Sequence, residues 1–138
     1  MNLSSLITDN ITELLVKIIE FTEIRQKILT RNINNINTPG FVPKDLEVNE
    51  LCQSLLYAIS EHARNQRLVL CDTENIKFGP DGSFQVRSII DQYAKELLRD
   101  DSDEYLALQI NKLLENALNQ RIAAELLRQK QDMISFLE

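Results

Sequence analysis

The chain has few of the residues that enzymes and metal proteins use. Its 138 residues include one histidine, two cysteines, three glycines, three prolines and no tryptophan, and only 6% are aromatic. Cys52 and Cys71 do not form the Cys-x-x-Cys spacing of a zinc or redox site. We interpret them as small apolar residues, with a disulfide as the alternative. The sequence has no glycine-rich phosphate loop and supports no Ser/His/Asp set, so we expect no enzyme, no catalytic residue, no metal and no cofactor.

The charge balance and the short apolar runs exclude further classes of protein. The formal net charge is −6, and the basic residues are scattered, whereas a nucleic-acid-binding protein needs a basic stripe. No run approaches the roughly 18 apolar residues of a membrane span. Residues 1–10 have neither a basic start nor a continuous apolar core, so we expect no cleaved secretory signal.

What the chain does contain is helical periodicity. The scarcity of Gly and Pro in a chain rich in Leu, Ile, Asn and Gln indicates a mainly α-helical fold. Apolar residues spaced by three and four predict a long first helix from about Leu3 to Ile36. Its interface face consists of Ile7, Ile11, Leu14 and Ile18.

An Asn-rich stretch followed by Pro and Gly ends this helix. Thr38 precedes Pro39 and is therefore disfavoured in the α region, while Asn37 tolerates a cap conformation. Pro39-Gly40 suits the central pair of a type II turn. We assign the turn and assembly motif to Asn32, Asn35, Asn37, Thr38, Pro39, Gly40 and Phe41.

The central part is shorter and mixed. Asn49 is expected to cap a second helix, and residues 68–70 form a possible short strand. Residues 76–78 and 83–86 flank Pro80-Asp81-Gly82, which predicts a β-hairpin. Ser88 is expected to cap a short third helix that reaches about Leu97.

The last helix is predicted to begin in the acidic segment 100–104, with Asp101 or Ser102 as its cap, and to run almost to Glu138. Its coiled-coil-like interface face contains Ile110, Leu113, Ala117, Ala124 and Leu127. The chain thus divides into an N-terminal assembly helix (1–38), a central segment (39–101) and a C-terminal assembly helix (102–138). The two terminal helices can pack antiparallel on each other. Each also has more apolar width than one partner helix covers, which favours packing between chains.

Residues 32–41 read Asn-Ile-Asn-Asn-Ile-Asn-Thr-Pro-Gly-Phe, which resembles the N-terminal signature of bacterial flagellar axial proteins, Asn-Ile-Ala-Asn-x-x-Thr-Pro-Gly-Tyr/Phe. Segments 25–29, 112–118 and 124–130 are similar to the rod proteins of this family, above all to the proximal-rod B type. Asn34 stands where the family usually has Ala. Gln109 stands where relatives often have an acid.

This resemblance implies a structural subunit of the basal-body rod that polymerises through its terminal helices into the proximal drive shaft. It implies export without a cleaved signal peptide and location in the rod that spans the periplasm. The implied partners are copies of the chain, other rod proteins, the flagellar export apparatus and the membrane-ring base.

Two alternative functions belong to other classes of protein. A small acidic helical adaptor or secretion chaperone shares the composition and charge, but it does not explain the Asn-Thr-Pro-Gly-Phe element. His62, the single histidine, is a candidate for a phosphotransfer site. It lacks the Lys and Gly that usually follow such a histidine, so we interpret it as an ordinary surface or partly packed residue.

Overall fold

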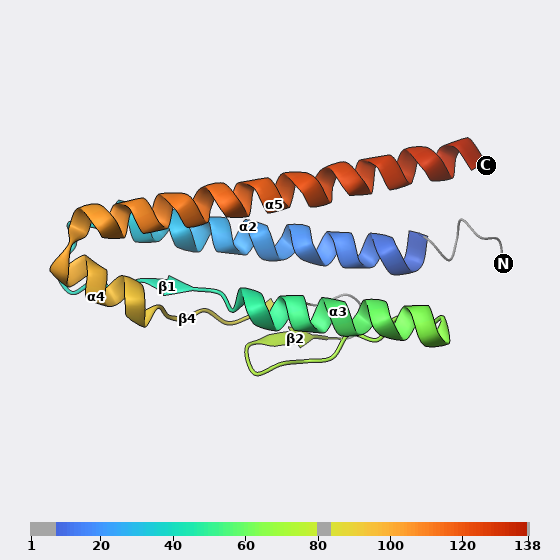
Figure 1. The fold of residues 1–138 in the computed structure, drawn as a ribbon, viewed down its shortest axis with the longest axis horizontal. Helices are drawn as coiled ribbons and strands as arrows, with labels where there is room; N and C mark the ends of the chain where they lie inside the picture. The colour runs from blue at the N-terminus through green and yellow to red at the C-terminus, as the bar shows by residue number, and fades with distance from the viewer. Residues whose placement is uncertain (1–7, 80–83, 138) are drawn as a thin grey trace. The chain divides into compact units, whose positions relative to one another are not determined.

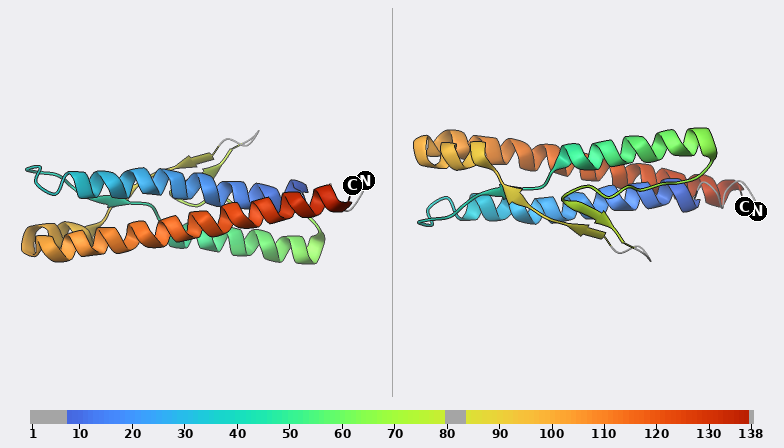
Figure 2. Two further views of the ribbon diagram at one scale, coloured as in Figure 1. Left: turned by 90° about the horizontal axis from the view of Figure 1, so that it is seen from above. Right: turned by 90° about the horizontal axis from the view of Figure 1, so that it is seen from below.

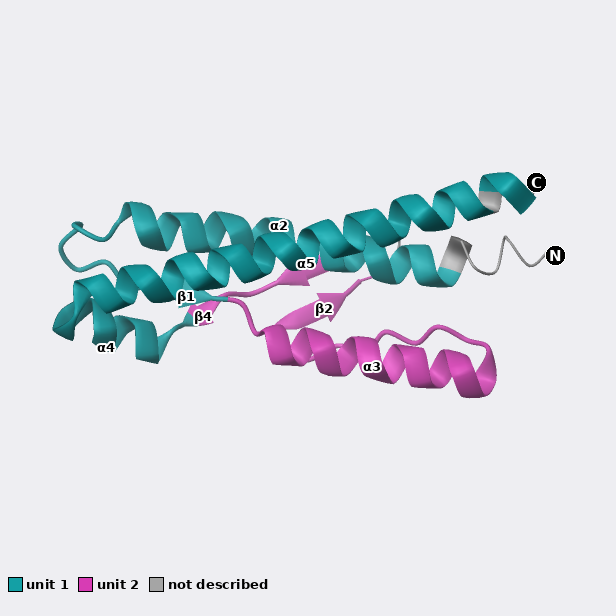
Figure 3. Cartoon of the chain, turned by 45° about the horizontal axis from the view of Figure 1, so that its top comes forward, with its two compact units in different colours: residues 1–45, 90–138 teal, residues 46–89 magenta. Residues whose placement is uncertain are grey.

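The computed structural model describes residues 8–79 and 84–137, and it is mainly α-helical with a small antiparallel sheet, as the sequence predicts (Figure 1). The chain forms two compact units (Figure 3). Unit 1 combines Met1–Asp45 with Ile90–Glu138, and unit 2 is Leu46–Ile89. The two ends of the sequence therefore belong to one unit, and the boundaries between the units lie inside the predicted central segment.

Unit 1 is built on two long helices. A π-helical turn, η1 (Thr8–Thr12), leads into α2 (Glu13–Asn34), and α5 spans Ser102–Leu137. The two helices lie antiparallel and side by side in every view (Figures 1 and 2). The predicted first helix is confirmed between residues 8 and 34, although it ends two residues before Ile36; residues 3–7 of the prediction lie outside the described residues.

The faces of α2 and α5 that point inward alternate between apolar and polar residues. Leu14, Leu15, Phe21 and Leu29 of α2 are buried, and so are Tyr105 and Ala123 of α5. The two helices also bury polar residues, namely Lys17, Thr22, Arg25, Asn32, Gln109 and Asn116. Leaving a buried polar group unpaired costs free energy, so the hydrogen bonds of these residues restrict how the two helices can pair. Among the described residues, the Gln109 Nε2 atom is buried without a hydrogen-bond partner.

A short helix, α4 (Gln92–Asp100), completes unit 1. Asp91 caps it, because the Asp91 Oδ1 atom accepts a hydrogen bond from the Ala94 N–H at 3.0 Å. The predicted cap at Ser88 is wrong: the β-branched pair Ile89–Ile90 forms a short strand, β4, that pairs with β1 (Lys44–Asp45). At the start of α5, the Asp101 carboxylate accepts from the Glu104 N–H at 3.2 Å, which confirms Asp101 as the cap.

Unit 2 contains α3 (Val48–Asn65) and a hairpin of β2 (Ile76–Phe78) and β3 (Phe84–Val86). The strands are antiparallel, with Ile76 opposite Val86 and Phe78 opposite Phe84, so the predicted hairpin is confirmed. The rings of Phe78 and Phe84 stack with their centres 5.4 Å apart. The Pro80-Asp81-Gly82 turn lies outside the described residues.

Two local expectations in unit 2 are wrong. Residues 68–70 form no strand. Asn49 is not the cap of α3, because the helix begins at Val48 with Glu47 in the cap position, two residues earlier than predicted. The neighbouring Glu50 has a different role. Its carboxylate accepts hydrogen bonds from the backbone and side-chain amides of Asn75, at 3.1 and 2.7 Å, and so ties the first turn of α3 to the loop before β2.

Candidate assembly site

The Pro-Gly turn after α2 has the predicted type II geometry. The Phe41 N–H donates to the Thr38 carbonyl at 3.2 Å, and Gly40 has a positive φ of 76°. A Cβ atom placed on Gly40 would meet nothing within 4 Å. Glycine is therefore required for its backbone conformation and not for space, since L-residues rarely adopt this φ.

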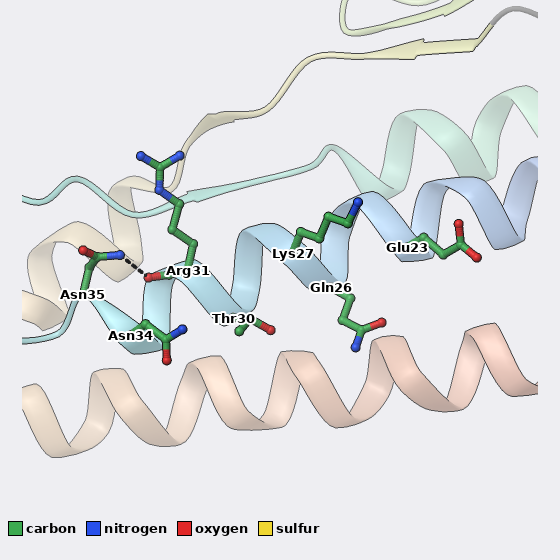
Figure 4. Close-up of a pocket in the computed structure, with 7 residues that line it drawn as sticks. All are labelled: Glu23, Gln26, Lys27, Thr30, Arg31, Asn34 and Asn35. Atoms are coloured by element: carbon green, nitrogen blue, oxygen red, sulfur yellow. Dashed lines mark hydrogen bonds between the residues drawn. The ribbon is translucent and has the colours of Figure 1, made fainter.

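Asn35 joins the helix end to this turn. Its N–H and its side-chain amide both donate to the Arg31 carbonyl, at 3.1 and 2.8 Å, as Figure 4 shows for the side chain (Figure 4). Its side-chain oxygen accepts from the Thr38 hydroxyl at 3.0 Å. The C-cap is thus Asn35, and the expectation that Asn37 caps the helix is wrong. Asn34 is exposed, so its amide displaces no packed group.

Asn32 holds the chain that returns from the turn. Its amide donates to the Lys44 carbonyl at 2.8 Å, and its side-chain oxygen accepts from the Lys44 N–H at 3.3 Å, so the side chain pairs with β1 as a strand backbone would. The same amide donates to the Gln109 side-chain oxygen of α5 at 3.0 Å. Asn32 is buried. One side chain therefore joins α2, β1 and α5.

Two further hydrogen bonds join α2 and α5, from α5 residues on either side of Gln109. The Tyr105 hydroxyl donates to the Asn32 carbonyl at 2.9 Å, and the Asn116 amide donates to the Thr22 carbonyl at 2.8 Å. Both α5 side chains bond to backbone atoms of α2. A shift of one helix along the other would break both bonds and bury their polar atoms unpaired, so these bonds specify the register.

A charged cluster occupies the same interface. Arg25 binds both carboxylate oxygens of Asp45, at 2.9 and 3.0 Å. The Lys112 ammonium lies 2.9 Å from the Asp45 carboxylate and 2.7 Å from the Asp91 carboxylate. Lys112 therefore connects the chain segments that leave and re-enter unit 1 to the first third of α5.

The charges of this cluster alter its pKa values. Burial alone raises the pKa of Asp45, but the hydrogen bonds and charges of Arg25 and Lys112 outweigh it and hold that pKa below its ordinary value. Burial lowers the pKa of Lys112, yet its bonds to Asp91 and Asp45 bring the net pKa above the ordinary value. Burial, followed by the charge of Asp91, raises the pKa of Tyr105 to about 12. Asp45 and Lys112 are thus ionised and Tyr105 is protonated at neutral pH.

The outward side of α5 is a row of aliphatic side chains spaced by four residues, which we call the α5 ridge. Its members are Ile110, Leu114, Leu118, Ile122 and Leu126, which are between 41% and 64% exposed. At 3.6 residues per turn, each step of four residues rotates about 40°, so the ridge turns through roughly 160°. A single partner helix covers a stripe of about 100°. A neighbouring helix that runs parallel to α5 therefore covers only part of the ridge.

The structure distributes the predicted interface residues over three environments. Leu14 is buried against the core of unit 1, while Ile11, Ile18, Leu113 and Leu127 are half-buried. The exposed ones are Ile110, Ala117 and Ala124. Ile7 lies outside the described residues. The line that α5 buries most deeply is instead Tyr105, Gln109, Asn116 and Ala123.

Reasoning from apolar spacing missed this line because two of its four members, Gln109 and Asn116, are polar. The spacing of four, seven and seven residues between Tyr105, Gln109, Asn116 and Ala123 keeps them on one helix face. That regular placement of polar groups is the signal that could have revealed it.

Among the grooves lined by the described residues, two lie on unit 1. One, of about 550 Å³, follows the polar face of α2 and is lined by Glu23, Gln26, Lys27, Thr30, Arg31, Asn34 and Asn35 (Figure 4). The other, of about 600 Å³, lies between the turn segment 36–42 and α4. Within residues 8–79 and 84–137 there is no group of three His, Cys, Asp or Glu side chains that could hold a metal ion.

Among the described residues, no helix combines the length and the hydropathy needed to cross a membrane. Comparison with protein-family models, with curated proteins and with solved structures gives no match to the chain.

Proposed function

We propose that the chain is a structural subunit that polymerises through its terminal helices. The observation that carries this proposal is the distribution of residues on α5. The helix buries polar side chains against α2 and leaves the aliphatic α5 ridge uncovered. Burying a Leu or Ile side chain is worth about 1.5–3 kcal/mol, so the ridge offers a large gain to neighbours that cover it. Because it turns through roughly 160°, it suits several neighbours, as in a helical array, better than a single dimer partner.

The flagellar rod is the assembly that we propose for it. The resemblance to rod proteins lies in residues 32–41, and the conformation of that segment gives the shared residues physical roles. Asn32 ties α2 to β1 and α5, Asn35 and Thr38 build the helix end, and Gly40 permits the turn. In this proposal the terminal helices form coiled-coil-like contacts in the proximal drive shaft.

The partners follow from the same proposal. They are copies of the chain, other rod proteins, the export apparatus that delivers the chain without cleavage of a signal, and the membrane-ring base. The chain performs no catalysis in this role. The small helical chaperone remains the competing function, since an exposed aliphatic face also suits a partner's helix.

Sedimentation velocity over a hundredfold range of concentration separates these functions. A rod-type subunit forms a series of larger species as concentration rises, whereas a chaperone sediments as one dimer of constant size. Leu114→Gln should raise the concentration needed for assembly by about tenfold, because it removes more than about 1.4 kcal/mol of apolar contact.

A matched control is Leu56→Gln on α3, since Leu56 and Leu114 are both 64% exposed. We expect this control to assemble like the unmodified chain. Equal effects of the two substitutions, or a dimer of fixed size at all concentrations, would contradict the proposal.

The flagellar assignment has its own test. If it is correct, the chain should co-purify with detergent-extracted basal bodies. If the chain assembles in solution but does not co-purify with basal bodies, the flagellar assignment is wrong and the assembly function still stands.

A further inference from the structure

The middle of the α5 ridge faces away from α2. Its residues Leu114, Leu118 and Ile122 are 64%, 58% and 49% exposed. Leu118 follows the buried Asn116 by two residues, and at roughly 100° per residue this places the two side chains about 160° apart around the helix. A second helix can therefore contact the middle of the ridge while α5 stays paired with α2.

The spacing of the ridge determines how a second helix packs on it. Residues four apart form an i±4 row, and helices whose i±4 rows interdigitate cross at about −50°, the commonest packing of helices in globular proteins. Two copies of the α5 ridge meet this condition, because each supplies an unbroken aliphatic row. Crossed helices diverge on both sides of their contact. Ile110 and Leu126 lie about 80° to either side of Leu118, so they stay outside it.

Two opposite charges flank the centre of the ridge. Glu115 and Arg121 lie three residues before and three residues after Leu118, and so about 60° to opposite sides of it. The i±3 row that contains them crosses the ridge at roughly 70°, so they lie at nearly the same level along it. Both are exposed, and within the part of the chain that the structure describes neither forms an ion pair. The charge of Arg121 also acts on Glu125, one turn later, but the carboxylate of Glu125 is bound by Arg128.

These charges favour one relative orientation of two copies. A two-fold axis along the interdigitated ridges exchanges the two sides of the ridge and keeps the level along it. It therefore places Glu115 of each copy beside Arg121 of the other, so the surface is complementary to itself at two places. Copies that point in opposite directions would instead bring Glu115 beside Glu115 and Arg121 beside Arg121, and like charges disfavour that pairing.

We infer that the middle of the α5 ridge binds the same surface of a second copy of this chain, with the two α5 helices crossing at about −50° and pointing in the same general direction. Leu118 lies at the crossing, with Leu114 and Ile122 on either side of it along the ridge. The two Glu115–Arg121 pairs close the contact at its edges. This inference rests on the proposed assembly function and names the first neighbour of the ridge, while the two ends of the ridge are left for further neighbours.

Charge reversal tests this contact. Glu115→Arg gives a chain that is positive at both flanking positions, and Arg121→Glu gives a chain that is negative at both. Each variant alone would place like charges together at two places, so sedimentation velocity should show that the concentration needed for dimer formation rises about tenfold. An equimolar mixture of the two variants restores both opposite-charge pairs and should form a mixed dimer at the concentration that the unmodified chain requires.

The chain that carries both substitutions also restores the two pairs and should dimerise like the unmodified chain. Glu23→Arg and Lys27→Glu, at exposed positions of α2, are the matched controls, because they change the net charge by the same amounts. They should leave dimer formation unchanged, both alone and mixed. Two results would overturn the inference: single α5 variants that dimerise like the unmodified chain, as copies pointing in opposite directions would, or a mixture that dimerises no better than its components.

The outcome also separates this contact from the proposed function. If the unmodified chain assembles and the single α5 variants assemble equally well, the crossing of the α5 helices is wrong and the assembly function stands. If the unmodified chain stays monomeric at every concentration, the proposed function fails and the inference fails with it.

Discussion

At the scale of single residues, hydrogen-bonding side chains determine how α2 and α5 pair. An interface of leucines alone accepts several registers, because one aliphatic contact replaces another at little cost. Here a shift of either helix would leave Asn32, Gln109 and Asn116 buried and unpaired, at about 1–3 kcal/mol for each lost partner. The buried polar residues therefore select one arrangement, and the aliphatic residues of the α5 ridge are left exposed.

Asp45 is the residue whose loss should destabilise this arrangement most. Asp45→Asn removes the charge that pairs with both Arg25 and Lys112, and it leaves the buried guanidinium of Arg25 without a counter-ion. Breaking a buried ion pair costs about 3–5 kcal/mol, and we expect about 3 kcal/mol because Lys112 is partly exposed. Urea unfolding followed by circular dichroism measures this change. Asp100→Asn, at the exposed pair with Arg99, is the matched control and should leave the unfolding midpoint unchanged.

The same variant should change the dependence of stability on pH. The pKa of Asp45 is lower in the folded chain than in the unfolded chain, where it is about 3.9. The unfolded state therefore binds a proton first as the pH falls, and the stabilisation, complete above about pH 5, is lost as the pH drops through the folded pKa. Between pH 5 and pH 2.5 the unmodified chain should lose more stability than Asp45→Asn. Parallel curves for the two proteins would mean that the carboxylate is not held by Arg25 and Lys112.

At the scale of elements, periodicity predicted the helices well and their ends less well. The long helices and the hairpin follow from apolar spacing and from a Pro-Asp-Gly turn, which are local signals. Ser88 and Asn49 were misplaced as caps because several residues near each helix start can cap it, and tertiary contacts decide between them. Asp91 caps α4 while its second oxygen binds Lys112, a partner 21 residues away that local reasoning does not include.

The turn after α2 allows the positive φ of Gly40 to be tested. Gly40→Ala should lower the free energy of unfolding by about 1 kcal/mol, because a left-handed conformation costs an L-residue roughly 1–2 kcal/mol and the added Cβ meets no atom within 4 Å. Gly40→Asn should cost less, since Asn tolerates this conformation better than other L-residues. Urea unfolding of the unmodified chain, Gly40→Asn and Gly40→Ala should give free energies of unfolding that decrease in this order. A loss for Ala well above 2 kcal/mol would point to a steric clash in place of backbone strain.

At the scale of the whole molecule, the sequence ends form the larger unit and the middle forms a separate one. The predicted division into two terminal helices and a centre was drawn from composition along the chain. The pairing of residues 13–34 with residues 102–137 depends on contacts across some 70 to 110 positions, among them Asn32 with Gln109 and Thr22 with Asn116. Such contacts leave no local pattern, so the sequence alone indicated antiparallel packing only as one of two possibilities.

This organisation predicts that unit 1 folds when the middle of the chain is removed. The chain leaves unit 1 after Asp45 and re-enters it at Ile90, and β1 and β4 are neighbours in a two-stranded sheet. Neighbouring strands lie about 4.8 Å apart, so a Gly-Ser-Gly-Ser linker in place of residues 47–88 can join them. The shortened chain should keep its helical circular dichroism and unfold cooperatively in urea.

Asp45→Asn provides the stringent control for this experiment, because the Arg25, Lys112 and Asp91 contacts all lie within unit 1. If those contacts form independently of unit 2, the substitution should cost the shortened chain the same free energy as the full chain, within about 0.5 kcal/mol. If the shortened chain is helical but Asp45→Asn does not change its free energy of unfolding, then α2 and α5 no longer pair in the register that their hydrogen bonds specify. Residues 46–89 would then be required for unit 1 to fold, and the division into two units would not describe how the chain is stabilised.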